Sequence, residues 1–278
     1  MSWKLGRVAG IDVYLHPTFL LFLAYFGAMQ DGLALVLIIS AAFGCVLLHE
    51  LGHALMARRF GIETEDITLY PIGGVARLRR MPKAPGAELL IALAGPAVNG
   101  LIVLGLSSLL WLGAFGGPWS ASPAAAFVSE LMRINLALAV FNLIPAFPMD
   151  GGRVLRALLS GWLGRARATM VAAGLGRGLA LLFGLFSLST WISGMNDWGL
   201  VHVALAGFIY IAAGSELARV LAERRPRGRF FPRGGDGGGI WTAPPGFQWI
   251  SRGNGVWQLA PIAVAPREPG DPSPWVGA

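Results

Sequence analysis

The chain has 278 residues, of which 55% are hydrophobic and 13% are charged. An ordinary soluble domain carries about 25% charged residues, so this composition excludes a water-soluble globule and predicts a polytopic membrane protein. The single cysteine, Cys45, excludes an intramolecular disulfide and a cysteine-rich zinc module. The net charge of +7 forms no basic stripe interleaved with aromatic residues, so we expect no nucleic-acid partner.

Six apolar stretches approach the length of about 20 residues that is needed to cross about 30 Å of hydrocarbon. In chain order they lie at 15–30, 33–57, 87–113, 124–144, 169–192 and 198–222. The first is the shortest, and it begins at His16-Pro17, where the proline gives the span a defined start. The sequence therefore predicts an all-α, polytopic membrane protein with about six transmembrane helices.

Basic residues are concentrated in alternate links between these spans. The links at 31–32, 114–123 and 193–197 contain no Lys or Arg, whereas the intervening segments contain nearly all of them. Because short cytoplasmic loops retain Lys and Arg, we expect a multi-pass protein of the bacterial inner membrane with both termini in the cytoplasm. Arg133 falls inside the fourth span, where we expect a structural salt bridge with Glu130 on the same helix face.

The composition changes at about residue 223. Residues 224–278 contain 9 of the 18 prolines and 11 of the 39 glycines of the chain, together with a cluster of arginines at 224–229. We therefore divide the chain into a membrane-embedded core, 1–223, and a basic cytoplasmic tail that is mostly irregular. Within the tail, an Asn-Gly pair at 254–255 between short apolar stretches indicates a small hairpin at 247–260.

The end of the second span contains the residues that carry chemistry. His49, Glu50 and His53 form the H-E-x-x-H pattern that is found in zinc metalloproteases. Residues four apart share a helix face, so His49 and His53 can both reach one tetrahedral ion, and Glu50 can act as general base toward water. If Arg58 marks the membrane boundary, His53 lies about 8 Å and His49 about 14 Å inside the membrane. A hydrolase at that depth needs a polar cavity that opens toward the cytoplasm.

A third protein ligand is needed to complete such a site, and it is typically His, Asp or Glu. Asp150 is the strongest candidate, because it follows the fourth span at the same side of the membrane. It lies between prolines that break the helix and glycines that let the backbone turn tightly. Asn142 projects an amide that could hold a substrate carbonyl or an oxyanion. Alternatively, this amide bonds to backbone groups that Pro145 frees.

On these residues the sequence resembles the site-2 protease family of intramembrane zinc metalloproteases. The resemblance covers about residues 10–223 and rests on motifs at 49–53, 71–75, 94–99 and 142–152. It implies that His49, His53 and Asp150 bind one zinc ion and that Glu50 is the catalytic acid and base. Asn142 matches a family position that assists substrate or transition-state binding.

The resemblance also implies substrate contacts outside the metal site. Gly95 and Asn99 match a glycine-x-x-x-asparagine motif in the third span. Gly73 and Gly74 match a short membrane-associated loop or hairpin, near 66–80, that guides an extended substrate. The PDZ domain or paired CBS domains of many members are not recognisable in this sequence.

Two functions from different classes follow. The first is an intramembrane zinc metalloprotease that cleaves a transmembrane protein substrate in the bilayer, in regulated intramembrane proteolysis. The alternative is a membrane zinc transporter or sensor that uses the same ligand cluster. A transporter needs further acidic ligands along a path, but Asp31 and Asp197 lie in links outside the spans.

Overall fold

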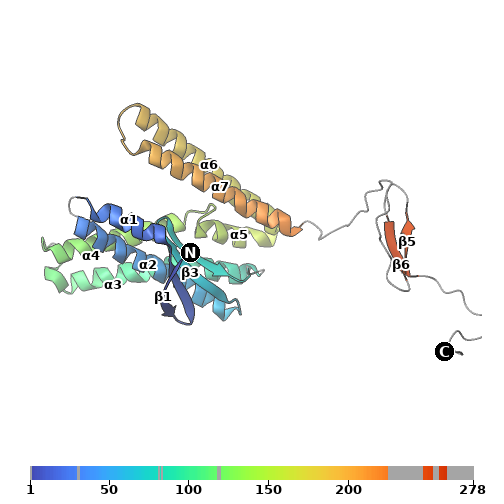
Figure 1. The fold of residues 1–278 in the computed structure, drawn as a ribbon, viewed down its shortest axis with the longest axis horizontal. Coiled ribbons are helices and arrows are strands. Elements are labelled where there is room, and N and C mark those ends of the chain that lie inside the picture. The colour runs from blue at the N-terminus through green and yellow to red at the C-terminus, as the bar shows by residue number, and fades with distance from the viewer. Residues whose placement is uncertain are drawn as a thin grey trace, which may run out of the picture. The chain divides into compact units, whose positions relative to one another are not determined.

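A computed structural model describes residues 2–29, 32–80, 82, 84–117, 120–224, 247–252 and 257–261. The chain divides into two compact units, Met1–Ala222 and Glu223–Ala278. In the described part of the first unit, helices α1–α7, a short 3₁₀ turn η1 (Ala114–Gly116) and a four-stranded sheet form the fold (Figure 1).

Among the described residues, five helices are long and apolar enough to cross a membrane. They are α2 (Gly32–Arg59), α3 (Pro85–Trp111), α4 (Pro123–Asn142), α6 (Arg165–Ile192) and α7 (Gly199–Arg224). They coincide with five of the six expected spans, which confirms the polytopic helical fold.

The stretch expected as the first span forms a shorter element. It is helix α1 (Pro17–Gly27), and its 11 residues extend about 16 Å, roughly half of the hydrocarbon thickness. Proline at the start of α1 and the ring of His16, which accepts a hydrogen bond from the amide of Thr18, fix its beginning. The described residues thus contain five long spans and one shorter apolar helix, where about six spans were expected.

A mixed sheet flanks α2 in sequence and packs against it. Its strand order is β1 (Trp3–Val8), β2 (Ile11–Leu15), β3 (Thr64–Tyr70) and β4 (Gly73–Leu78). Strands β2 and β3 are parallel, whereas the two outer pairs are antiparallel. The hairpin expected near 66–80 is thus β3–β4, and it is half of a sheet that the sequence did not reveal.

The sheet and α2 share a small hydrophobic core. Ile11 and Ile67 of the sheet pack against Leu51 and Ala54, which lie among the residues of the H-E-x-x-H helix end. This packing holds β4, the edge strand of the sheet, beside the same end of α2.

The segment after α4 forms an additional helix that the sequence did not predict. This helix, α5 (Asp150–Leu163), starts at the proposed third ligand. Phe147, just before it, is fully buried, and its amide donates to the carbonyl of Ala172 on α6 at 3.1 Å. Phe147 also packs against Ala213 of α7, so the α6–α7 pair supports the start of α5.

A buried ion pair connects α5 to α3. The Nε atom of Arg156 donates to Oε1 of Glu88 at 2.7 Å, and both side chains are buried. Arg165 of α6 lies 3.5 Å from the second oxygen of Glu88, and Glu216 of α7 lies 4.0 Å from Arg156. This charge cluster therefore joins four helices. The salt bridge expected between Glu130 and Arg133 is also present, on an exposed face.

We expect Glu88→Gln to lower the free energy of unfolding by about 3 kcal/mol, because it removes the nearest counter-charge of the buried Arg156 guanidinium. Thermal unfolding of the purified protein in detergent measures the effect. Glu63→Gln is the matched control: its exposed ion pair with Arg79 lies outside the membrane helices and contributes at most about 1 kcal/mol. Equal losses for the two variants would contradict a structural role for the buried pair.

The second unit contains two described strands, β5 (Phe247–Ser251) and β6 (Trp257–Pro261), which pair antiparallel. They fall in the range where a hairpin was expected. The Asn-Gly pair at 254–255 and the remainder of the tail, at 225–246 and 262–278, lie outside the described residues.

Candidate metal centre

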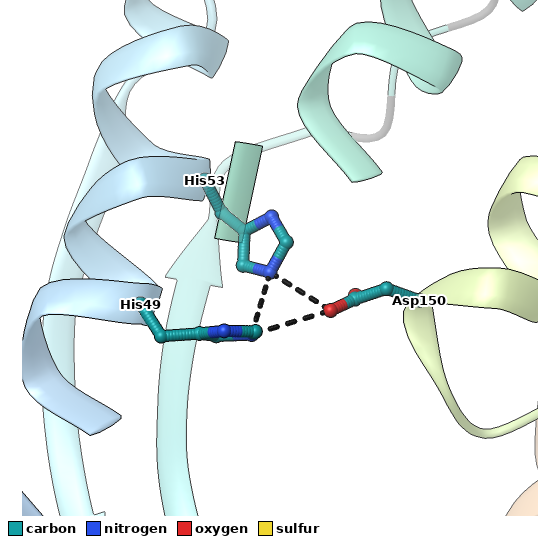
Figure 2. A group of neighbouring side chains, drawn as sticks. All are labelled: His49, His53 and Asp150. Atoms are coloured by element: carbon teal, nitrogen blue, oxygen red, sulfur yellow. Dashed lines mark hydrogen bonds and ion pairs between the residues drawn. The ribbon is translucent and has the colours of Figure 1, made fainter. Parts of the chain in front are cut away.

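Three side chains from two distant segments converge at the end of α2 (Figure 2). Nε2 of His53 lies 3.0 Å from Nε2 of His49 and 3.0 Å from Oδ2 of Asp150. Nε2 of His49 lies 3.2 Å from the same carboxylate oxygen. All three residues are buried. The structure thus brings together the three residues that the sequence indicated as ligands, although 97 positions separate His53 from Asp150.

The spacing and protonation of these atoms suit a bound cation. Ligand atoms about 2.0–2.1 Å from a tetrahedral ion lie roughly 3.3 Å from one another, close to the separations found here. Nδ1 of His53 lies 2.7 Å from the carbonyl of Ile91, where it can only donate. In the neutral ring, Nε2 then presents a lone pair toward the other two atoms, which is the arrangement of a metal-binding histidine with a backbone partner.

Asp150 is held in its ionised form, as a metal ligand must be. Burial of the carboxyl group favours its neutral form, but hydrogen bonds from His49 and His53, when these rings carry protons on the facing nitrogens, outweigh burial and lower the pKa of Asp150 below its usual value. A cation bound in place of those protons would act in the same direction. The carboxylate also lies in the first turn of α5, where the helix dipole stabilises negative charge.

Helix α3 passes very close to the two histidine rings because Gly95 has no side chain. A Cβ atom at this position would overlap Nε2 of His53 and would lie 2.7 Å from Nε2 of His49. Gly52 permits the same close approach from α2, since a Cβ there would lie 2.9 Å from the carbonyl oxygen of Ala94. Gly95 therefore contributes space at the metal centre.

We expect Gly95→Ala to weaken metal binding by at least about 10-fold, because the added methyl group displaces both rings from their converging positions. Metal analysis after dialysis against a weak chelator measures this change. Gly100→Ala, on the same helix, is the control, since a Cβ there has nothing within 4 Å. Unchanged metal content in Gly95→Ala would contradict this prediction, because it would show that the His49 and His53 rings can shift without loss of metal affinity.

A cavity of about 470 Å³ opens beside the three ligands. Its polar lining includes Glu50, Asn99 and Asn142 in addition to the ligands themselves. Glycines at 73 and 74 of β4 form another part of its wall, and a Cβ on Gly74 would lie 2.8 Å from Cγ of Glu50. The edge strand therefore lies directly against the candidate general base.

The two amides in the cavity wall differ in how they are bonded. Asn142 ends α4, and its Nδ2 donates to the carbonyl of Leu138 at 3.0 Å, which leaves the second N–H of the amide free for another acceptor. Asn99 is fully buried, and neither polar atom of its side chain has a hydrogen-bond partner among the described residues. A buried amide without partners is costly, so Asn99 would gain from a polar ligand in the cavity, and the free N–H of Asn142 can donate to the same ligand.

Other residues in the cavity wall were not indicated by the sequence. Arg153 lies three residues after Asp150, on the same face of α5. A helix predicted at this place would therefore have indicated Arg153 as a neighbour of the site. Phe208 of α7 and Phe141 of α4 give the wall an apolar part. Their sequence neighbours are also apolar, so no pattern distinguishes them from lipid-facing residues.

Comparison with known proteins gives a consistent result. The sequence model of peptidase family M50 matches residues 37–117 and 106–185, which together cover more than half of the chain. A zinc metalloprotease of Methanocaldococcus jannaschii is 37% identical over 228 residues, which make up 80% of this chain and 62% of that protein. Stage IV sporulation protein FB of Bacillus subtilis is 29% identical over 152 residues, 54% of this chain and 48% of that protein.

A solved structure shares the fold. The site-2 protease from Methanocaldococcus jannaschii superimposes with a TM-score of 0.57 at 37% sequence identity. The match covers 78% of this chain and 95% of that chain. The membrane helices and the ligand cluster are thus found on a fold that is already known.

Proposed function

Because the chain belongs to peptidase family M50, the site-2 protease family, we propose that it is an intramembrane zinc metalloprotease. Its reaction is hydrolysis of a peptide bond in or near the transmembrane segment of a membrane protein. The observation that carries this proposal is the convergence of His49, His53 and Asp150 beside Glu50 in one cavity, at the end of a helix that can cross a membrane.

The metal is zinc, one ion per chain, held by the two histidines and Asp150. Two imidazole nitrogens and one carboxylate oxygen, with a position left for water, are the ligands of a hydrolytic zinc site. When bound, zinc supplies Lewis-acid polarisation of the scissile carbonyl and of the attacking water.

The protein's own groups move the proton and hold the substrate. Glu50 lies in the cavity next to the first ligand, so its carboxylate can accept a proton from the attacking water and then give it to the leaving amine. The free N–H of Asn142 can donate to the oxygen on which negative charge develops. Asn99 can hold a second carbonyl of the substrate, since both of its polar atoms lack partners among the described residues.

The substrate binds in an extended form along β4. This strand is at the edge of the sheet, and Gly73 and Gly74 place its backbone in the cavity wall. An exposed edge offers N–H and C=O groups to an added strand. A helical substrate must therefore unwind before cleavage, which favours transmembrane segments with helix-breaking residues near the cleaved bond.

The basic links fix the orientation in this proposal. Both termini and the cavity face the cytoplasmic side of a bacterial inner membrane, because Lys and Arg cluster at that end of the spans. The lipid bilayer and a transmembrane substrate are the expected partners.

Reconstitution tests the function. The full chain is placed in liposomes with zinc and with a membrane protein whose transmembrane segment contains Gly or Pro, and mass spectrometry identifies the products. We expect cleavage inside the segment, loss of cleavage with a zinc chelator, and recovery when zinc is returned. Zinc flux across the liposome membrane without cleavage of any such segment would instead support a transporter.

A further inference from the structure

Helix α6 carries an arginine, Arg177, far from both of its ends. The Nε atom of this side chain is buried and has no hydrogen-bond partner among the described residues. Within the same described part of the chain, no carboxylate lies within ion-pair distance of its guanidinium, and its neighbour is the ring of Tyr210 on α7, 5.2 Å away. Arginine inside an apolar span is costly and marks a functional position more often than a structural one.

The depth of Arg177 places its charge near one membrane surface. Fifteen residues separate it from Ile192, the far end of α6, which corresponds to about 22 Å of helix. In a hydrocarbon layer of about 30 Å, its Cα atom then lies about 8 Å from the opposite boundary. Helical side chains point toward the helix N-terminus, so the guanidinium can reach the lipid headgroups at the end of α6 that carries Arg165 and Arg167.

The guanidinium is held in a fixed position on α7. Gly214 provides the space: a Cβ atom there would overlap Nη2 of Arg177. The Tyr210 ring lies beside the guanidinium, and the cation–π interaction further restricts it. The α6–α7 pair therefore presents an oriented positive charge at a defined depth.

An apolar groove of about 390 Å³ begins at Tyr210 and runs away from the charge between α6 and α7. Ala180 and Gly184 on α6 and Ala206 and Gly207 on α7 contribute small side chains to its lining. From Ala180 to Leu188, its extent along α6 is about 12 Å.

The dimensions of the groove favour a narrow occupant. An α-helix is about 10 Å in diameter and would lie across the groove, whereas a single hydrocarbon chain is thinner and can lie inside it. The lining is almost entirely apolar, which suits such a chain.

We propose that the α6–α7 pair binds one anionic phospholipid, with its phosphate on Arg177 and one acyl chain in the groove. A phosphate can accept a charge-assisted hydrogen bond from the guanidinium, and it supplies the counter-charge that Arg177 lacks among the described residues. The groove starts beside the charged group and extends along the helices, so a phosphate on Arg177 and an acyl chain in the groove can belong to the same lipid. This site is separate from the metal centre.

Lipid titration of the full chain tests this site. The protein is purified in an uncharged maltoside detergent and titrated with phosphatidylglycerol, and native mass spectrometry counts the bound lipid. We expect one saturable site, weaker binding of phosphatidylcholine, and no binding of glycerol 3-phosphate, which lacks the acyl chain. Equal binding of glycerol 3-phosphate would overturn the proposal.

Two variants test the two halves of the site. Gly207→Leu places a side chain in the groove at a position where a Cβ has nothing within 4 Å, and Arg177→Gln removes the charge. We expect each to weaken phosphatidylglycerol binding at least 10-fold. Gly174→Leu, where a Cβ also has nothing within 4 Å, and Arg167→Gln are the matched controls and should change it less than 2-fold.

The groove variant keeps the proposal falsifiable even if Arg177→Gln unfolds. Wild-type phosphatidylglycerol binding by Gly207→Leu would overturn it. It would also be overturned if Gly207→Leu kept its lipid and lost binding of a transmembrane peptide, because the groove would then hold a protein helix.

Discussion

Glu50→Gln is expected to slow peptide hydrolysis by about 1000-fold, because the amide can neither accept the proton of the attacking water nor return it to the leaving amine. The substitution preserves the size of the side chain beside β4, where Gly74 leaves little room for a different shape. The ligand atoms come from His49, His53 and Asp150, so zinc should remain at one ion per chain.

The measurement pairs cleavage of a reconstituted membrane substrate with zinc analysis of the same sample. Glu63→Gln is the control, since Glu63 is an exposed carboxylate that pairs with Arg79 on the surface of the sheet. It should keep full activity and full zinc. Cleavage by Glu50→Gln at the wild-type rate would refute the assigned role of Glu50, and loss of its zinc would mean that Glu50 holds the metal.

Asp150→Ala is expected to weaken zinc binding by more than about 100-fold. Loss of a residue that only hydrogen-bonds to a metal ligand already lowers metal affinity or activity by about 10- to 100-fold, and Asp150 is expected to be a ligand itself. In this variant only the two histidines of α2 remain as protein ligands, and the contact between His53 and the Asp150 carboxylate of α5 is lost. Cleavage should therefore be lost together with the metal, in contrast to Glu50→Gln.

Zinc affinity is measured by competition with a chromophoric chelator, and cleavage is measured in parallel. Asp197→Ala is the control, because Asp197 lies in the exposed link between α6 and α7. We expect it to match the wild type. If Asp150→Ala bound zinc as tightly as the wild type, the third ligand would have to be sought elsewhere.

The sequence predicted which residues meet at the site better than it predicted the shape around them. The four-residue spacing of His49 and His53 determines their common face, and long apolar runs determine the membrane helices, so both follow from local pattern. Asp150 could be proposed because few acidic residues follow a span on the same side. Its actual position depends on α5, whose existence the prolines and glycines around it did not indicate.

Features that depend on long-range packing were missed. Strands β1 and β2 are short and carry charges such as Lys4 and Asp12, so their sequence does not alternate clearly enough to show that they join β3. Arg177 lies within an apolar span, and the sequence does not show that Tyr210 and Gly214 of α7 lie beside it. Which residues of different helices lie side by side depends on tertiary contacts, and a short stretch of sequence does not show these.

The separation of the ligands along the chain has a consequence for biosynthesis. His49 and His53 are translated and can enter the membrane 97 residues before Asp150 is added to the chain. During that interval the nascent chain holds two histidines and the candidate general base but lacks its carboxylate ligand. If the proposed function is correct, the metal centre of a growing polypeptide is therefore incomplete until α5 docks on the α6–α7 pair that supports it.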